Sequence, residues 1–489
     1  MSTGKWRGVE YNEFSMPTHQ SYDVIVLGAG SAGFSAAEAA HKQGARVCII
    51  EKEKLGGECP HVACVPSKAM LKVSKTLQTL RQARDFGLTT GGIETDFSKM
   101  MAYPKKVVQQ ITGAGTTDPY EKRLRQLTID RVMGEGHFFD GQTLVVTSGK
   151  TETWLKAKAF VVATGSIPFI PSIEGIDQVH TLTFKDIWSL KHQPKSLAII
   201  GGGPVGCEFA TFFSAIGTHV TLIHSGPYIL NREDEEISRL AQEAMEEQGI
   251  EIITSTQVNR FFGVRGAGYG IELMSEGKQR VVAADDILIA AGKRPNKEKM
   301  GLEALGITLD KQGYIRVNKE QHTNTKQIFA AGDVSGGYQF THAAHAQGVV
   351  AGTNAAFVAL KKRRPLLVVD ERVIPRVTFI DPEVASVGMT QKEAKKKYGN
   401  ILVGTFSIPQ LGRSATESVT RGFIKLIADK KTRKILGGHI IGPCAGEIIH
   451  EIALAMYLHA KIDVLDQLIH AFPTFSEAVT AAAANVSEQ

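Results

Sequence analysis

Cysteine, long apolar runs and charge of one sign are all scarce in this chain. Its 489 residues include only 5 cysteines, too few for the disulfide framework of a small secreted domain. No stretch approaches the roughly 18 apolar residues that cross a bilayer, and the first twenty residues lack the apolar core of a signal peptide. We therefore expect a protein without a membrane segment, in a reducing, cytoplasmic setting.

The charges nearly balance along the chain. Lys and Arg number 56 against 50 Asp and Glu, a formal net charge of +6, and the longest basic cluster runs only from Lys361 to Arg364. So thin a spread gives no support to nucleic acid binding. The length is several times that of a typical domain of about 150 residues. A peptide-sized scaffold is excluded, and several cooperating domains are expected.

Glycine, in contrast, is abundant, and the informative glycines follow apolar segments. The apolar run Asp23–Leu27 ends at Gly28, Gly30 and Gly33, and a helical pattern and a second apolar run follow. In a strand–turn–helix–strand unit these glycines allow a tight turn, close approach to a pyrophosphate, and close helix–strand packing. Glu51 ends the second run about 20 residues after Gly30, where a carboxylate binds a ribose 2′-hydroxyl. The pattern predicts a dinucleotide site.

The same pattern recurs later, with one difference at the end of its second strand. An apolar run begins at Leu197, and the glycines that follow it are Gly201, Gly203 and Gly206. The next strand ends at His224 and offers no carboxylate to bind a free ribose 2′-hydroxyl, which disfavours NADH. No Arg follows at once to bind a 2′-phosphate. The nearest is Arg232, with His219 and His224 as weaker cations or simply exposed strand-end residues. The choice between NADPH and NADH stays open.

The rest of the chain predicts how these units are organised. Three more buried-strand runs end at Gly165, Gly292 and Gly332, and short alternating runs followed by helices begin after a basic linker. We expect an α/β fold with two Rossmann-like dinucleotide-binding domains and a separate C-terminal α+β domain. The expected boundaries are an N-terminal extension at 1–20, a first dinucleotide-binding domain at 21–170 continued by a central part at 295–371, a second at 171–294, and the C-terminal domain at 372–489.

Two cysteines, Cys59 and Cys64, lie close together in the sequence. In a reducing compartment such a pair suits catalysis or metal binding better than a structural role. Five residues of ideal helix rise about 7.5 Å, more than the roughly 5.5 Å that a disulfide prefers between Cα atoms, so a bridge would need a distorted turn. A strained bridge is easily reduced. A zinc site would need a second ligand pair, and none is apparent, so no metal site is expected.

With these motifs in place, the chain resembles the flavoprotein disulfide reductases, which include dihydrolipoamide dehydrogenase, glutathione reductase and mercuric reductase. The resemblance covers about residues 22 to 485. It is carried by Gly-Gly-x-Cys-x-x-x-x-Cys-x-Pro-Ser-Lys at 56–68, Ala-Thr-Gly-Ser at 163–166, the second glycine turn up to Glu208, Gly-Lys-Arg-Pro-Asn at 292–296, Ala-Gly-Asp at 331–333, and the segment 381–388.

The resemblance implies a mechanism. The first unit is expected to bind FAD and the second NADPH or NADH. The reduced flavin would open a Cys59–Cys64 disulfide, with Cys64 against the flavin and Cys59 exchanging with substrate. Lys68 and Glu208 would form an ion pair near the isoalloxazine. The C-terminal domain would make a homodimer whose active sites span both subunits.

By the same resemblance, Asp333 holds the ribityl chain of the flavin. The other residues expected at the cofactors are Gly28, Gly30, Gly33, Glu51, Lys52, Gly57, Glu58, Lys68, Gly136, Thr164, Gly165, Ser166, Gly201, Gly203, Gly206, His224, Val258, Gly292, Arg294, Phe340, Thr341 and His342.

One position departs from the family pattern. Thiol reductases of this family carry His-Pro-x-x-x-Glu near the C-terminus, but this chain has Phe472 before Pro473, and Glu477 remains without its imidazole. Phenylalanine cannot take a proton, and loss of a positioned base costs about 10²- to 10⁴-fold in rate. Mercuric reductases are similar in placing an aromatic residue there. Their C-terminal cysteine pair is absent here, where the last cysteine is Cys444.

Three functions follow from these observations. The leading one is an FAD-dependent NAD(P)H oxidoreductase with catalytic residues Cys59, Cys64, Lys68, Glu208 and Glu477, acting on a small acceptor such as a metal ion, a quinone or a disulfide. The second is a dihydrolipoamide dehydrogenase with a displaced base, His470 or His61. The third, of another class, is a flavin redox sensor in which the state of the cysteine pair is the signal.

Overall fold

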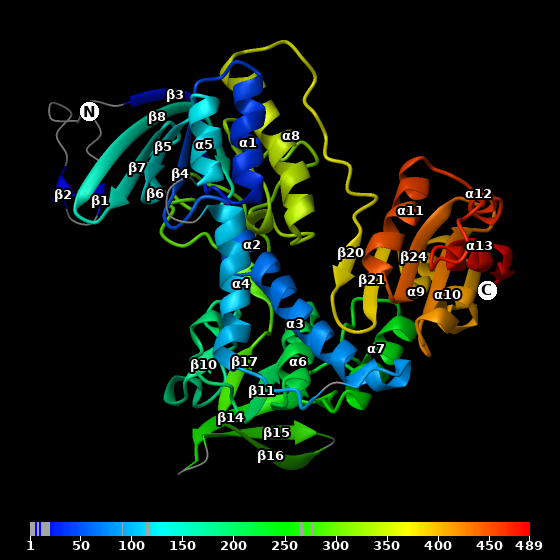
Figure 1. The fold of residues 1–489 in the computed structure, drawn as a ribbon. Coiled ribbons are helices and arrows are strands. Elements are labelled where there is room, and N and C mark those ends of the chain that lie inside the picture. The colour runs from blue at the N-terminus through cyan, green and yellow to red at the C-terminus, as the bar shows by residue number, and fades with distance from the viewer. Residues whose placement is uncertain are drawn as a thin grey trace. The chain divides into compact units, whose positions relative to one another are not determined.

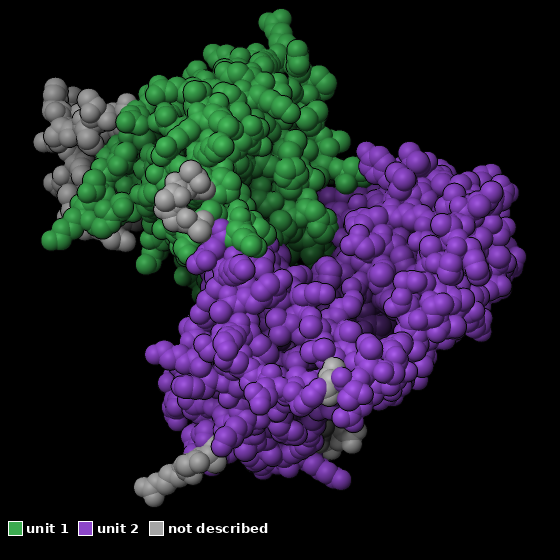
Figure 2. Space-filling view, in the orientation of Figure 1, with its two compact units in different colours: residues 1–61, 110–167, 294–370 green, residues 62–109, 168–293, 371–489 purple. Residues whose placement is uncertain are grey.

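The computed structural model describes residues 5–6, 9–10, 20–89, 91–113, 118–264, 268–275 and 277–489. The N-terminal extension predicted at 1–20 lies outside the described residues, apart from the short strands β1 (Lys5–Trp6) and β2 (Val9–Glu10) and the first residue of β3. The chain forms two compact units, coloured separately in Figure 2. Unit 1 comprises residues 1–61, 110–167 and 294–370, and unit 2 comprises residues 62–109, 168–293 and 371–489.

Unit 1 is built on a mixed sheet whose strand order is β5-β4-β3-β8-β7-β6, with β19 paired to β8. The central strand β3 runs parallel to both neighbours, and Val24 is in register with Val47 on β4 and Ala159 on β8. The strands are β3 (Gln20–Leu27), β4 (Val47–Glu51), β5 (Asp130–Met133), β6 (Glu135–Phe138), β7 (Thr143–Ser148), β8 (Thr151–Val162) and β19 (Ile328–Ala330).

Both faces of β3 are buried, as expected for a central parallel strand. Val24 and Val26 pack into one hydrophobic cluster with alanines of α1 and α8, while Ile25 and Leu27 pack into another on the opposite face. Helices α1 and α8 lie side by side (Figure 1). A Cβ added to Gly352 would stand 2.0 Å from the Ala36 carbonyl oxygen, so only glycine permits this approach. The helices of unit 1 are α1 (Ser31–Lys42), α2 (Glu58–His61), α5 (Pro119–Gln126) and α8 (Thr341–Ala359).

Unit 2 contains a second dinucleotide-binding sheet, all parallel, in the order β10-β17-β11-β12-β13, with an antiparallel three-stranded sheet β14-β15-β16 beside it. Helix α3 packs against α6 through a large apolar cluster. The strands are β10 (Thr181–Leu182), β11 (Ser196–Ile200), β12 (His219–Ile223), β13 (Glu251–Ile253), β14 (Gln257–Gly263), β15 (Tyr269–Ser275), β16 (Lys278–Ala284) and β17 (Asp286–Ile289). The helices are α3 (Cys64–Gln82), α4 (Phe97–Thr112), α6 (Pro204–Ala215) and α7 (Glu235–Glu247).

The C-terminal part of unit 2 is an antiparallel sheet in the order β20-β21-β24-β23-β22-β25, with helices packed on it. Its strands are β20 (Arg376–Thr378), β21 (Glu383–Gly388), β22 (Ile401–Ser407), β23 (Phe423–Asp429), β24 (Ile435–Gly442) and β25 (Ser487–Glu488). Its helices are α9 (Gln391–Tyr398), α10 (Gly412–Thr416), α11 (Ala445–Tyr457), α12 (Ile462–Asp466) and α13 (Glu477–Ala484).

Short elements complete the described chain. These are strands β9 (Ser166–Pro168) and β18 (Lys293–Pro295), which pair with each other, and the 3-10 helices η2 (Ala83–Phe86), η3 (Ile176–Gln178), η4 (Ile187–Ser189), η5 (Asp333–Ser335) and η6 (Ile408–Gln410). None of the helices described is long and apolar enough to cross a membrane. The predicted α/β class, with two Rossmann-like units and an α+β C-terminal domain, is confirmed.

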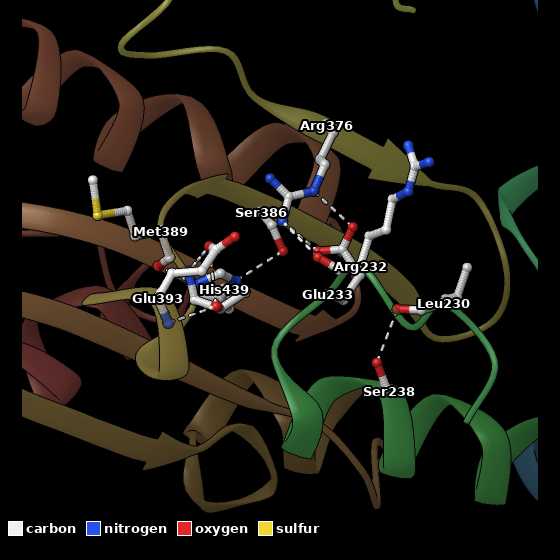
Figure 3. Close-up of polar contacts among 10 residues, drawn as sticks. Leu230, Arg232, Glu233, Ser238, Arg376, Ser386, Met389, Glu393 and His439 are labelled. Atoms are coloured by element: carbon white, nitrogen blue, oxygen red, sulfur yellow. Dashed lines mark hydrogen bonds and ion pairs between the residues drawn. The ribbon is translucent and has the colours of Figure 1, made fainter. Parts of the chain in front are cut away.

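Charged side chains hold the C-terminal sheet to the segment before α7. Arg376 donates to both carboxylate oxygens of Glu233, at 2.7 and 2.9 Å, as Figure 3 shows. Lys425 on β23 is 2% exposed, and its Nζ lies 2.6 Å from Oδ1 of the buried Asp234. The His439 ring is fully buried between the Ser386 hydroxyl and the Met389 carbonyl, as Figure 3 also shows. Each charge has a partner, which offsets part of its desolvation cost.

Candidate active site

The first glycine turn joins β3 to α1 in unit 1. Gly28 has φ +98°, and a Cβ there would stand 2.3 Å from the Ala163 carbonyl oxygen. A Cβ on Gly33 would stand 1.8 Å from the Gly28 carbonyl oxygen. Gly30 is the N-cap of α1 and carries no side chain to occupy the first-turn N–H groups, which therefore face a potential anion. The turn has the shape that a pyrophosphate requires.

Glu51 stands beside this turn with its carboxylate fixed by backbone. Its Oε2 accepts from the Ala29 N–H at 2.8 Å, and its Oε1 accepts from the Glu53 N–H at 2.8 Å. Gly57 approaches the same turn, since a Cβ there would stand 2.7 Å from the Gly30 Cα. An oriented carboxylate beside an uncapped helix start fits the adenosine diphosphate part of FAD.

A second group of predicted residues meets where β8 and β19 end. Ser166 donates from Oγ to the Asp333 carboxylate at 2.6 Å, and Thr164 donates from Oγ1 to the Asn296 carbonyl at 2.6 Å. The Gly332 N–H is held by the Gln347 side chain at 2.8 Å. The structure therefore brings Asp333 next to the 164–166 turn, a polar surface suited to the hydroxyls of a ribityl chain.

The start of α8 lies next to the start of α1. Ser31 donates from Oγ to the Thr341 carbonyl at 2.9 Å, and the rings of Phe340 and His342 stack at 5.5 Å. Of the remaining predicted residues of unit 1, three adjoin these groups in sequence: Lys52 follows Glu51, Glu58 follows Gly57 and begins α2, and Gly165 lies between Thr164 and Ser166. Gly136 lies on β6 among core side chains, and Arg294 forms an ion pair with Glu298.

The second glycine turn, in unit 2, repeats the first. Gly201 has φ +120°, and a Cβ on Gly206 would stand 1.9 Å from the Gly201 carbonyl oxygen. Gly203 is the N-cap of α6, and Pro204 opens the helix, a position that proline favours. The other predicted residues, Val258 on β14 and Gly292 with φ +118°, lie in the same unit but contribute no charge.

His224 does not support the cationic role considered for it. Its Nδ1 accepts from the Gly202 N–H at 3.3 Å, and burial lowers the pKa of the ring. A histidine that accepts through one nitrogen and is desolvated stays neutral near pH 7. Its Nε2 is buried without a hydrogen-bond partner. Arg232, the arginine nearest in sequence, is exposed.

The two cysteines belong to different helices. Cys59 lies in α2, and Cys64 is the first residue of α3. Ala63 between them has φ −120° and ψ −102°, so the backbone leaves helical geometry there, as the predicted distorted turn requires. Both side chains are half-buried. Among the described residues, no group of three or more His, Cys, Asp or Glu side chains is arranged to hold a metal ion.

Lys68 lies one turn after Cys64 on α3 and meets α6. Its Nζ donates to Oε1 of Glu208 at 2.9 Å and to Oε2 at 2.8 Å. Glu208 is 5% exposed, and its Oε1 also accepts from the Phe379 N–H at 3.1 Å. The predicted ion pair is therefore present, and a third residue joins it.

The C-terminal segment places Phe472 on the surface with its ring 80% exposed. Glu477 accepts from the Thr474 N–H at 2.6 Å through Oε1. His470, in contrast, is engaged at both ring nitrogens, by Glu451 at 3.0 Å and by Thr480 at 2.9 Å. Burial raises the pKa of Glu451, and His470 opposes this rise.

The other histidine considered as a displaced base is His61. Its Nε2 lies 2.9 Å from the Leu55 carbonyl and therefore donates, which leaves Nδ1 as the nitrogen with a lone pair. His61 ends α2 and is half-buried.

Sequence reasoning missed Tyr120, which lies near Cys59. The Tyr120 ring packs against Gly56, where a Cβ would stand 2.6 Å from the ring, and contacts Phe34 edge-on at 5.3 Å. Burial raises the pKa of Tyr120, and the nearby Cys59 adds to the rise. No spacing rule connects the two residues, because the fold alone brings α5 to the cysteine segment.

Comparisons with known proteins agree with this geometry. Residues 22–348 match the family described as pyridine nucleotide-disulphide oxidoreductase, and residues 374–483 match the dimerisation domain of that family. A mercuric reductase of Staphylococcus aureus is 32% identical over 463 residues, which cover 94% of this chain and 82% of that protein. A dihydrolipoyl dehydrogenase of Bacillus subtilis (strain 168) is 34% identical over 469 residues, covering 94% of this chain and 97% of that one.

Solved structures are similar over the same length. The HOCl-induced flavoprotein disulfide reductase RclA from Escherichia coli, and its Cu(II) complex, each match with a TM-score of 0.80 and 26% identity. The matches cover 95% of this chain and 99% of those chains.

Proposed function

Since this chain belongs to the pyridine nucleotide-disulphide oxidoreductase family, whose members bind FAD and use NAD(P)H, we propose that it reduces a small acceptor through the Cys59–Cys64 pair. The acceptor we propose is a thiophilic metal ion, Hg(II) or Cu(II). FAD, when bound, supplies the relay of two electrons between NAD(P)H and the cysteine pair.

The observation that carries this proposal is the nature of residue 472. A dithiol or a disulfide substrate needs a proton moved at sulfur, which a phenylalanine cannot do. Reduction of a metal ion held by two thiolates needs no such proton transfer. The two electrons of one NAD(P)H, which also releases one proton, reduce one Hg(II) to Hg(0) or two Cu(II) to Cu(I). The similarity to a mercuric reductase and to a protein solved as a Cu(II) complex supports this acceptor class.

The residues of the chain have distinct roles in this proposal. The first glycine turn and Glu51 bind the adenosine diphosphate part of FAD, and Asp333 binds the ribityl chain. Lys68, held by Glu208, would place a positive charge beside the isoalloxazine and so would favour its anionic reduced form. Cys64 would face the flavin and Cys59 would meet the acceptor.

We also propose a homodimer whose active sites include residues of both subunits. The match to the dimerisation domain supports the assembly. The end of α11 and the segment between α12 and α13 expose apolar side chains that a partner would cover: Leu454 at 60%, Tyr457 at 59%, Leu458 at 67%, Ile469 at 94% and Phe472 at 80%. In such a dimer Phe472 would line the partner's cysteine site. The scarcity of cysteine supports a cytoplasmic setting.

A second candidate function is dihydrolipoamide oxidation with a displaced base. The position of His61 favours it, because this residue ends the helix that carries Cys59 and its Nδ1 is the nitrogen that keeps a lone pair. His470 gives it no support, since both of its ring nitrogens are engaged.

The test is steady-state oxidation of NADH and of NADPH with Cu(II), Hg(II), a quinone, glutathione disulfide and lipoamide as acceptors. We expect turnover with the metal ions, loss of that turnover in Cys64→Ser, and little thiol activity. Efficient reduction of lipoamide, the reverse of dihydrolipoamide oxidation, would favour the second candidate if it were lost in His61→Asn. Failure to oxidise NAD(P)H at a useful rate with any of these acceptors would indicate a redox sensor.

A further inference from the structure

We propose that Phe379 is a positioning residue that holds Lys68 and Glu208 in their catalytic arrangement. The inference rests on the proposed role of Lys68 beside the flavin. It adds to the ion pair a residue from the C-terminal domain, on the connection between β20 and β21.

Phe379 contacts both members of the pair, by two different kinds of interaction. The Lys68 ammonium lies 4.8 Å from the centre of the Phe379 ring, over its face, where the ring quadrupole attracts a cation. The backbone N–H of Phe379 donates to Oε1 of Glu208 at 3.1 Å. One residue therefore binds the cation with its side chain and the anion with its backbone.

The local fold fixes Phe379 between two anchors. Its neighbours Thr378 and Ile380 are 3% and 2% exposed, and Ile380 packs into the cluster that joins α3 and α6. The Gln248 side chain donates to the carbonyl of Asp381. The connection thus has little freedom, and the 37% exposed ring projects from it toward Lys68.

The need for such a residue follows from the length of a lysine side chain. Lys68 is 35% exposed, and its ammonium is held by a single carboxylate. Removing the ring would leave the ammonium free to swing about Glu208 toward water, which would lower the average positive charge at the flavin. A cation–π contact at a partly exposed site is worth a factor of about 2 to 5 in an equilibrium constant. We expect a change of that size in the ratio of reduced to oxidised flavin at a fixed potential.

The test measures the midpoint potential of bound FAD by dye equilibration without any acceptor, with Cys59 and Cys64 both replaced by Ser in every variant so that the cysteine pair takes up no electrons. Phe379→Leu keeps the N–H that serves Glu208 and removes the ring face. We expect it to retain FAD and to lower the proportion of reduced flavin about 2- to 5-fold. Phe379→Tyr keeps the ring and should match the wild type. Tyr398→Leu is a matched control, since Tyr398 is 41% exposed and lies under Lys397 at 5.4 Å on α9.

A double-mutant cycle separates positioning from general loosening of the fold. If Phe379 acts through Lys68, then Phe379→Leu should change nothing further in a Lys68→Met background. An equal shift in both backgrounds, or no shift in Phe379→Leu alone, would overturn the proposal. Failure of the proposed function would give a different result. The wild type would not turn over with metal ions, but the midpoint potential of FAD would still differ between the wild type and Phe379→Leu.

Discussion

Phe472→His tests whether the ring at this position is what excludes dithiol substrates. Phe472 is 80% exposed, and a Cβ added to Gly412 would stand 3.5 Å from its ring. Imidazole is smaller than phenyl and fits the same space. A substitution at so exposed a site should change the stability of a single chain by no more than about 0.5 kcal/mol.

The expected size of the effect depends on how well the Glu477 carboxylate can orient the new imidazole. A positioned general base contributes about 10²- to 10⁴-fold. Glu477 already accepts the Thr474 N–H through Oε1, so only Oε2 remains to orient the new ring. We therefore expect the lower end, about 10²-fold, chiefly in kcat for dihydrolipoamide oxidation. The base must be neutral, so the gain should appear as the pH rises through about 6.5, the ordinary pKa of His.

The assay compares wild type, Phe472→His and Phe472→Ala in dihydrolipoamide-dependent reduction of NAD⁺. The alanine variant opens the same space without adding a base and should gain little. Flavin reduction by NAD(P)H should be equal in all three. Equal thiol turnover in wild type and Phe472→His, with FAD content intact, would refute the reasoning, and equal gains in the histidine and alanine variants would show that space, not proton transfer, was limiting.

Three further predictions concern cofactor retention and stability. Gly33→Ala should purify colourless, since its Cβ would stand 1.8 Å from the Gly28 carbonyl oxygen, and flavin absorbance per chain measures this. Asp234→Asn should cost about 1.5 to 3 kcal/mol in urea unfolding, because Lys425 loses its buried carboxylate partner and is left with the exposed Glu236 and the Gln391 side chain. Burial opposes ionisation of Asp234, but hydrogen bonds from Lys425 and Gln391 outweigh it and lower its pKa, so this stabilisation should be present above about pH 3.9 and be lost below it. His470→Ala should lower the melting temperature but leave acceptor kinetics unchanged, because the ring serves Glu451 and Thr480.

Local signals allowed the core of each dinucleotide-binding unit to be predicted. An apolar strand followed by closely spaced glycines leaves few alternatives, so a helix follows each glycine turn as expected. The helices α1 and α6 begin earlier than predicted, directly after Gly30 and Gly203, so that Gly33 and Gly206 lie within them. The Lys68–Glu208 pair was expected from a family resemblance, because nothing local connects residues so far apart in the chain.

Other features depend on tertiary contacts that carry no local signal. Lys425 stands in a strand where a lysine would be expected to face water, but its partner Asp234 lies far earlier in the sequence. The Phe379 ring and Tyr120 are ordinary aromatic residues until the fold brings them to Lys68 and Cys59. His224 was considered as a cation because its hydrogen bond to the Gly202 N–H could not be foreseen.

The assembly of unit 1 from three separate segments constrains how the chain is made. Strand β8 pairs with β19, and α1 is covered by α8, so neither can be completed until residue 359 has left the ribosome. At ordinary synthesis rates of about 5 to 20 residues per second, the alanine face of α1 waits about 15 to 60 seconds for its partner. During this interval the nascent chain presents an apolar helix face and an unpaired strand edge, both of which favour aggregation. Synthesis speed and chaperone supply should therefore limit the yield of the flavin-binding unit more than the supply of FAD.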